Sequence, residues 1–234
     1  MIKVRENIPN SLTLANLICG CLASVEALTL HQVNAAWFIF LAAVFDLLDG
    51  FAARLLHVNS DLGKELDSLS DLISFGLAPA LIMYSYLTKA AHDQWLMYSF
   101  LLMPVCAAVR LARFNLEVEG QSSFRGLPSP ANAMIICSIP ILAASDLNVV
   151  VSITQSPALL VAIIAALSLL MISQIPMLSL KFKNFGWREN ELRYLFIVAS
   201  LVVTLLGLHA IPVVITFYFL ASASQKYFDE KVQG

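Results

Sequence analysis

The residues best suited to chemistry in this 234-residue chain are acids within an otherwise apolar stretch. Between positions 46 and 76 the sequence reads DLLDGFAARLLHVNSDLGKELDSLSDLISFG. Neighbouring ionised carboxylates repel one another and are costly to desolvate, so a group of them requires protons or bound cations. Mg²⁺ or Mn²⁺, with Ca²⁺ as a competitor in one site, matches such oxygen donors. Two such ions about 4 Å apart would form a clamp for phosphoryl transfer.

The first group of acids is predicted to lie on one face of a helix. Asp46, Asp49, Gly50 and Ala53 fall within one arc, because successive helical residues turn by about 100°. Gly50 and Ala53 would leave backbone-lined space beside the carboxylates, into which a bulky, flat group could fit. A site that only conducted ions would not need that space.

The second group is predicted on the next helix. Gly63, Asp67 and Asp71 follow one another at intervals of four and form a stripe. Two helices joined by a short loop pack antiparallel, so the carboxylates of both groups can converge. Asp61 and Glu65 are expected in the loop or at its edge, facing solvent.

Composition indicates an integral membrane protein. The chain is 59% hydrophobic and only 13% charged, with a mean hydropathy of +0.79, whereas a soluble domain is nearer half apolar and a quarter charged. The net charge of −2 argues against a nucleic-acid binder. The four cysteines form no CxxC pair and are expected to pack within apolar helices.

Apolar runs long enough to span a bilayer predict an all-α polytopic fold with eight transmembrane helices. We expect one integral domain over residues 1–234, whose first apolar run is a retained helix and not a signal peptide. The predicted helices cover 11–30, 33–56, 65–87, 93–114, 129–146, 157–178, 191–208 and 210–228.

The distribution of basic residues predicts the orientation. With both termini in the cytoplasm, every one of the 14 Lys and Arg residues except Lys89 falls on the inner side. The acidic segment then lies at the cytoplasmic face of the membrane. Glu26 is expected to be buried toward the outer end of the first helix, with no role that follows from the sequence.

A polar stripe marks the start of the first helix. Asn10, Thr13 and Asn16 recur at intervals of three within IPNSLTLANLICG, so they share a face. Asn10 or Ser11 could cap the helix. A stripe that continues into the apolar run suggests nucleotide contacts as well.

Two further motifs contain basic residues. RLARFN contains Arg110 and Arg113, and FRGLPSPANA contains Arg125 and Ser129. A guanidinium can bind phosphate or carboxylate through two hydrogen bonds, but arginines at this depth also anchor helices at the inner membrane surface. Both interpretations stay open, and Ser129 is predicted to cap the helix that follows.

The acidic pattern resembles a family signature. The arrangement Asp46-x2-Asp49-Gly50-x2-Ala53-Arg54-x8-Gly63-x3-Asp67-x3-Asp71 is similar to that of the CDP-alcohol phosphatidyltransferases at every position. The resemblance implies an enzyme with a helical membrane fold and a two-metal site. Such an enzyme would transfer a phosphatidyl or related group from a CDP-linked donor to an alcohol and release CMP.

The resemblance also implies roles for individual residues. The metal ligands would be Asp46, Asp49, Asp67 and Asp71, and Asp71 would also act as the general base. The motif residues lining the nucleotide and donor site would be Asp49, Gly50, Ala53, Arg54, Gly63 and Asp67. The polar stripe adds Asn10, Thr13 and Asn16 to this predicted site.

Within the family, IPNSLTLANLICG, SDLISFGLAPA, RLARFN and FRGLPSPANA resemble the phosphatidylserine synthase branch. That branch implies CDP-diacylglycerol and L-serine as substrates and a homodimer in the bilayer. Arg110, Arg113 or Arg125, with Ser129, would then bind the acceptor. An ether-lipid donor, or glycerol phosphate, inositol phosphate or choline as acceptor, stays an alternative.

The acids are also compatible with a second class of protein, a transporter. Buried acids could form the pathway of a divalent-cation transporter. Three features disfavour a transporter: the acids gather at one membrane face, no inverted repeat is evident, and the small residues beside them would have no role. A non-catalytic scaffold is disfavoured because every motif acid is intact.

Overall fold

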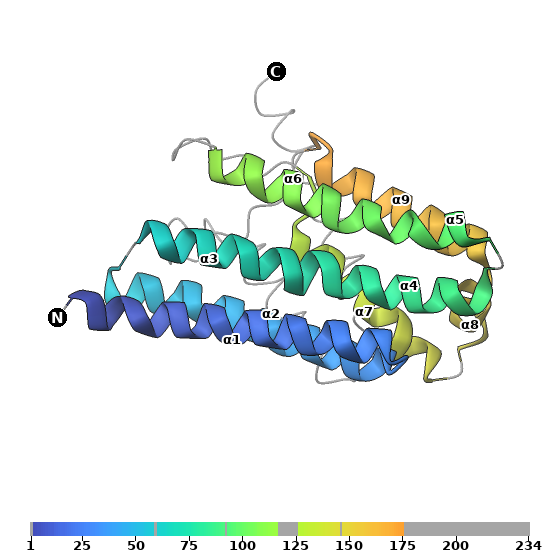
Figure 1. Ribbon diagram of the computed structural model, residues 1–234, viewed down its shortest axis with the longest axis horizontal. Coiled ribbons are helices and arrows are strands. Elements are labelled where there is room, and N and C mark those ends of the chain that lie inside the picture. The colour runs from blue at the N-terminus through green and yellow to red at the C-terminus, as the bar shows by residue number, and fades with distance from the viewer. Residues whose placement is uncertain (1, 59, 92, 117–125, 146, 176–234) are drawn as a thin grey trace, which may run out of the picture.

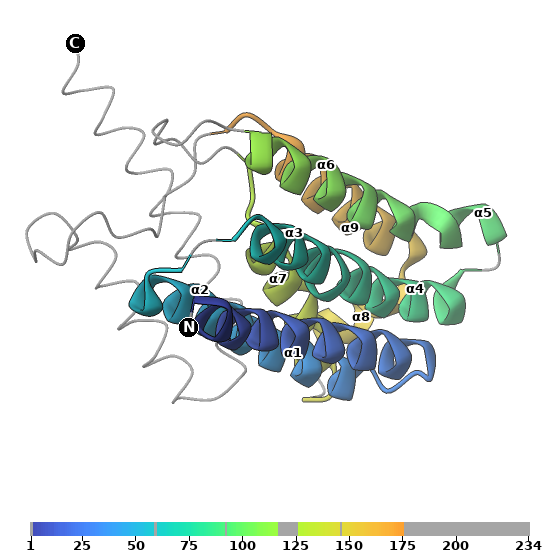
Figure 2. The ribbon, with the colours of Figure 1, turned by 60° about the vertical axis from the view of Figure 1, so that its left-hand side comes forward.

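The computed structural model describes residues 2–58, 60–91, 93–116, 126–145 and 147–175, and within them every regular element is helical. Figure 1 shows the long helices lying roughly side by side, and Figure 2 shows α3 and α4 between the α1–α2 pair and the α6–α9 pair. The elements are α1 (Ile2–Leu28), α2 (Gln32–Leu56), α3 (Asp61–Asp71), the π-helical η1 (Leu72–Leu77), α4 (Ala78–Ala90), α5 (Gln94–Met97), the 3-10 segment η2 (Tyr98–Leu101), α6 (Leu102–Leu116), α7 (Ser129–Ala143), α8 (Asn148–Gln155) and α9 (Pro157–Ile172).

Four helices of the described part are long and apolar enough to cross a bilayer, which confirms a helical membrane protein. They are Asn7–Leu28, Gln32–Leu56, Asp61–Ala90 and Gln94–Leu116, close to the first four predicted spans. The fifth predicted span differs, because α7 ends at Ala143 and the chain turns by 112° into α8. Helix α9 corresponds to the sixth, and 191–208 and 210–228 lie outside the described residues.

The turn between α1 and α2 accounts for Glu26. Its Oε2 atom lies 3.1 Å from His31 Nδ1 and accepts a hydrogen bond from Asn34 Nδ2 at 3.1 Å. The Glu26 side chain is 27% exposed, so the expectation that it is buried within the helix is wrong. Its carboxylate joins the end of α1 to the start of α2.

The connection between α2 and α3 is shorter than predicted. Helix α2 ends where His57 adopts a left-handed conformation with φ of 50°. Ser60 then caps α3 by accepting a hydrogen bond from the Gly63 N–H at 3.0 Å. Asp61, the first residue of α3, lies at the edge of the loop as expected, Glu65 lies one turn further into α3, and both are exposed as expected.

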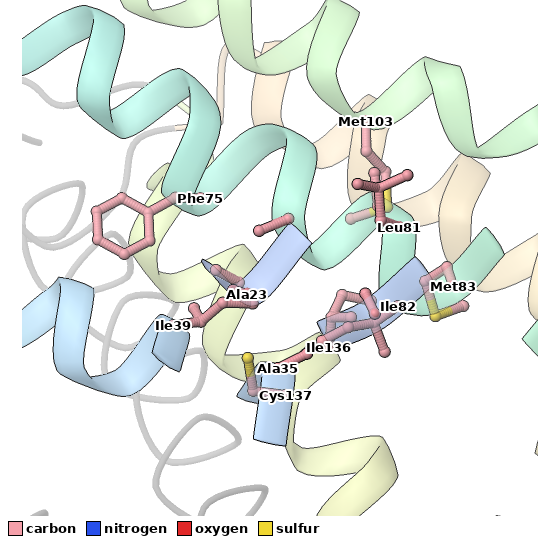
Figure 3. Close-up of a cluster of buried hydrophobic side chains, with 14 of the residues drawn as sticks. Ala23, Ala35, Ile39, Phe75, Leu81, Ile82, Met83, Met103, Ile136 and Cys137 are labelled. Atoms are coloured by element: carbon pink, nitrogen blue, oxygen red, sulfur yellow. The ribbon is translucent and has the colours of Figure 1, made fainter. Parts of the chain in front are cut away.

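The hydrophobic core of the described residues draws side chains from α1, α2, η1, α4, α6, α7 and α9. Figure 3 shows Ile39, Phe75, Ile82 and Ile136 gathered there, and all four are 0% exposed. Cys137 is buried beside them. The core thus packs α2, which carries Asp46 and Asp49, together with η1 and α4, which follow Asp71.

The outer face of α2 is apolar and uncovered by the described residues. Its exposed residues recur at intervals of three and four, as expected of one helix face turned toward lipid. They are Trp37, Leu41, Val44, Leu48, Phe51 and Leu55.

Candidate active site

Three of the predicted acids lie together in the structure. Asp46 and Asp49 come from α2, and Asp67 comes from α3. One carboxylate oxygen from each can be chosen so that all three atoms lie within 4.8 Å of one another. Asp49 is buried and the other two are half-buried. We call these three residues the acidic cluster.

The acidic cluster fits a divalent cation. It offers oxygen donors only, which hard ions such as Mg²⁺ and Mn²⁺ prefer. Three carboxylates this close carry up to three negative charges at a partly buried position. A bound cation would offset that repulsion.

The fourth acid, Asp71, stands at the end of α3, one turn beyond Asp67. Its Oδ1 atom accepts a hydrogen bond from Asn16 Nδ2 at 3.3 Å. The structure thus gives Asp71 a protein partner on α1, while the other three acids form the cluster.

The polar stripe of α1 faces these acids. Thr13 Oγ1 donates to Asp49 Oδ2 at 2.6 Å, in addition to the Asn16–Asp71 contact. Both side chains are buried. The predicted cap at Asn10 or Ser11 is wrong, since α1 begins at Ile2 and continues through Pro9.

The close approach of α1 to η1 was not predicted. Ser74 of η1 donates from Oγ to the main-chain oxygen of Asn16 at 3.0 Å. A Cβ added to Gly20 would lie 2.8 Å from Ser74 Cα, so only glycine allows this contact. No sequence signal marks the π-helical segment, which is a local departure from α-helical periodicity.

The small residues of the motif differ in the space they leave. A Cβ on Gly50 would find only Arg54 Nη2, at 4.0 Å, so the predicted open space exists there among the described residues. A Cβ on Gly63 would lie 2.9 Å from Ser60 Oγ and 3.0 Å from Asn10 Oδ1. Gly63 therefore permits close packing of the α3 cap against α1.

Arg54 and Ala53 lie on the last turns of α2. The Arg54 Nε atom donates to the Gly50 carbonyl oxygen at 2.9 Å, and the residue is exposed. Ala53 is half-buried. The guanidinium thus lies beside the open space at Gly50, on the helix that carries Asp46 and Asp49.

The predicted acceptor residues take separate partners. Arg110 Nη1 donates to Ser129 Oγ at 3.0 Å, which joins α6 to α7. Arg113 Nη1 instead donates to the Ile172 carbonyl oxygen, at 3.4 Å, near the end of α9. Arg125 lies outside the described residues.

Ser129 is not the helix cap that the sequence predicts. Pro128 occupies the cap position and makes no side-chain hydrogen bond there, and Ser129 is the first residue of α7. The buried Ser129 hydroxyl accepts from Arg110 instead. Proline at the cap fixes the backbone entering the helix, which leaves the serine side chain available to α6.

Sequence reasoning missed the residues that hold α3 in place. Lys64 Nζ donates to the main-chain oxygen of Asn115 at 3.2 Å, and Asn115 Nδ2 donates to Ser68 Oγ at 2.8 Å. These contacts join α3 to the end of α6. The cap at Ser60 was not predicted either, although a serine directly before an acidic first turn is a standard cap signal.

Comparison with known proteins identifies what the chain is similar to. The family model described as CDP-alcohol phosphatidyltransferase matches residues 6–206. A Bacillus subtilis CDP-diacylglycerol–serine O-phosphatidyltransferase is 36% identical over 185 residues, which cover 79% of this chain and 94% of the relative.

Two further relatives carry the same name. The Helicobacter pylori (strain 26695) protein is 31% identical over 222 residues, covering 91% of each chain. The Mycobacterium leprae protein is 36% identical over 178 residues, covering 73% of this chain but only 57% of the relative.

Proposed function

The chain belongs to the CDP-alcohol phosphatidyltransferase family, and we propose that it transfers the phosphatidyl group of CDP-diacylglycerol to the hydroxyl of L-serine. The products are phosphatidylserine and CMP. The observation that carries the proposal is the acidic cluster, in which three carboxylates lie within 4.8 Å with Asp71 one helical turn away. The names of the relatives support serine as the acceptor.

The four acids provide the metal site in this proposal. Asp46, Asp49 and Asp67 would hold a divalent cation, and Asp71 would contribute to a second. Bound Mg²⁺ or Mn²⁺ would supply charge neutralisation for the donor diphosphate. Thr13, which donates to Asp49, would keep that carboxylate oriented.

Asp71 is proposed as the general base. The serine hydroxyl oxygen attacks the phosphorus that carries diacylglycerol and forms the new P–O bond. The bond from that phosphorus to the bridging oxygen breaks, and CMP leaves. Asp71 takes the hydroxyl proton, and the Asn16 amide holds the carboxylate for that purpose.

The donor site is proposed along α1 and the ends of α2 and α3. The open space at Gly50 and the exposed guanidinium of Arg54 suit the cytidine diphosphate group. The remaining predicted donor residues lie on the same three helices: Asn10, Thr13, Asn16, Asp49, Ala53, Gly63 and Asp67.

The acceptor carboxylate is proposed to bind a guanidinium. Arg110 is the first candidate, because Ser129 already holds it at a defined position between α6 and α7. Arg113 and Arg125 stay candidates from the sequence. A bidentate contact to the serine carboxylate would orient the hydroxyl toward Asp71.

The membrane setting is part of the proposal. We place both termini and the acids on the cytoplasmic side, from the distribution of basic residues, within an eight-helix integral domain that forms a homodimer. The bilayer then delivers the lipid donor laterally, while serine enters from the aqueous phase.

The experiment is a panel of acceptors with purified protein. CDP-diacylglycerol and Mg²⁺ or Mn²⁺ are supplied with serine, glycerol 3-phosphate, inositol, inositol phosphate or choline, and CMP release is measured. Release with serine alone is expected. Release with another alcohol would assign the chain to another branch, and transport of divalent ions without any CMP release would support the transporter.

A further inference from the structure

Asn16 has a second polar atom beside the acids. Its Nδ2 atom donates to Asp71 Oδ1, which fixes the orientation of the amide because only the nitrogen can donate to a carboxylate. The Oδ1 atom of the same amide is buried, and it has no hydrogen-bond partner in the part of the chain that the structure describes. The residue as a whole is 0% exposed.

A buried acceptor left unpaired is costly, and native proteins keep few of them. The two described side chains that bond to other atoms of Asn16 do not pair with this oxygen. The Asp71 carboxylate, when ionised, is itself only an acceptor. The Ser74 hydroxyl donates to the main-chain oxygen of Asn16 and not to its side chain.

We propose that Asn16 Oδ1 accepts a hydrogen bond from the ammonium group of the acceptor, and thereby selects amino alcohols over alcohols that lack this group. The inference rests on the proposed function. Serine carries its hydroxyl and its ammonium on adjacent carbons. A serine hydroxyl placed against Asp71 would bring the ammonium on the next carbon toward the amide that is bonded to Asp71.

The charge of the site favours the same ligand. An ammonium offers three donors and a positive charge, and a hydrogen bond from a charged donor is stronger than one from a neutral hydroxyl. In the proposed function bound cations offset the acidic cluster, so the Asp71 carboxylate and the Asn16 oxygen are the groups left to attract the ammonium. Asn16 is therefore a specificity-determining residue as well as a positioning residue for Asp71.

The position of Asn16 is fixed by its own helix. Its main-chain oxygen is bonded to Ser74 Oγ at 3.0 Å, and one turn further along α1 Gly20 lies directly against Ser74. The α1–η1 contact therefore leaves the amide little freedom to turn toward another partner. A fixed acceptor suits discrimination between substrates that differ by one group.

The test compares two acceptors that differ only in the ammonium. L-Serine and 3-hydroxypropionate share the hydroxyl and the carboxylate, and 3-hydroxypropionate has hydrogen in place of the ammonium. The preference for serine is the ratio of the two kcat/KM values, measured as CMP release. If 3-hydroxypropionate is not turned over, it is tested as an inhibitor of the reaction with serine. The preference for serine is then its inhibition constant divided by the KM for serine.

In Asn16→Ala, the preference for serine is expected to fall by about 10- to 100-fold, the effect of losing one hydrogen bond to a charged donor. If Asn16 only positions Asp71, or if its oxygen binds water alone, kcat/KM falls equally for both acceptors. The preference for serine then stays at the wild-type value. That result would overturn the inference. Thermal unfolding in detergent shows whether the variant is folded, and Asn16→Leu replaces it if it is not.

Ser24→Ala is the matched control, because Ser24 bonds to the Gly20 main-chain oxygen about two turns further along α1, and the change keeps both the Asn16 amide and the Ser74 contact. Its preference for serine should equal that of the wild type. An equal fall in Ser24→Ala would mean that the ratio reports helix packing, and the inference would fail. Absence of CMP release from the wild type with serine would instead refute the proposed function.

Discussion

Thr13 and Asn16 each donate a hydrogen bond to a different acid of the motif. Thr13 donates to Asp49 within the acidic cluster, and Asn16 donates to Asp71 outside it. Four carboxylates of one motif therefore have two kinds of surroundings: three share a centre, and one is held by an amide. In the proposed function the cluster holds the first cation, and Asp71, which would also contribute to a second cation, is the general base.

Asp71→Asn tests the second role. The substitution keeps the size of the side chain but removes its capacity to take a proton. Turnover should fall by about 10²–10⁴-fold, the usual contribution of a general base, while CDP-diacylglycerol still binds. The measurement is the rate of CMP release alongside donor binding, and turnover at the wild-type rate would exclude Asp71 as the base.

Thr13→Val tests the first role. The valine has the same shape as threonine but cannot donate to Asp49, so a metal ligand loses the contact that orients it. Mn²⁺ affinity, measured by titration of the purified protein, should weaken by about 10- to 100-fold.

The matched control for Thr13→Val is Ser11→Ala, since the exposed Ser11 side chain bonds, among the described residues, to the main chain of Asn7. It should bind Mn²⁺ as the wild type does. Equal affinity in Thr13→Val and the wild type would show that the hydroxyl is not needed to orient the ligand.

The sequence predicts most of the residues of the site but few of their partners. Periodicity alone groups Asp46 with Asp49 and aligns Asn10, Thr13 and Asn16, because helical spacing is a local property. It cannot show that Thr13 meets Asp49, since that contact joins residues 36 positions apart. The pairing of Arg110 with Ser129 depends in the same way on how α6 meets α7.

At the level of elements, the decisive contact joins α1 to η1. Gly20 allows the two backbones to approach, and Ser74 bonds across the gap. The π-helical turn of η1 follows Asp71 directly, so it connects the acid to the buried part of the span. Sequence periodicity predicts one helix over 65–87 and overlooks this turn, which shifts the faces of the residues after it.

Gly20→Ala tests this contact. The added methyl group would overlap Ser74, so α1 must move away from η1. Overpacking of this kind costs about 1–3 kcal/mol, and both Tm and turnover should fall.

Cys21→Ala serves as the control for Gly20→Ala, because Cys21 is the next residue of α1 and is exposed. Thermal unfolding in detergent and CMP release are measured for both variants. A Tm for Gly20→Ala equal to that of Cys21→Ala would show that α1 and η1 do not pack as described.

At the level of the whole molecule, the exposed apolar face of α2 and the four long apolar helices both place the chain in a bilayer. Composition alone predicts that environment. It does not predict the bend between α7 and α8, where Pro140 lies within the last turn of α7 and the chain changes direction by 112°. The orientation in the membrane stays a prediction from the distribution of charge.

Cysteine labelling tests the orientation. In a background without native cysteines, Lys89→Cys should react with a membrane-impermeant thiol reagent in intact cells, because Lys89 is predicted outside. His57→Cys should react only after the membrane is permeabilised, since His57 lies at the exposed end of α2 beside the acids. The reverse pattern would place the acidic site on the outer face.

The central claim is that the acidic site joins serine to the phosphatidyl group as CMP leaves. The most direct measurement follows both products in one reaction, with labelled L-serine and CDP-diacylglycerol in liposomes. The account predicts one lipid-bound serine for each CMP released, and rates of formation of both products that are about 10²–10⁴-fold lower in Asp71→Asn. CMP release without lipid-bound serine, or equal yields from Asp71→Asn and the wild type, would contradict it.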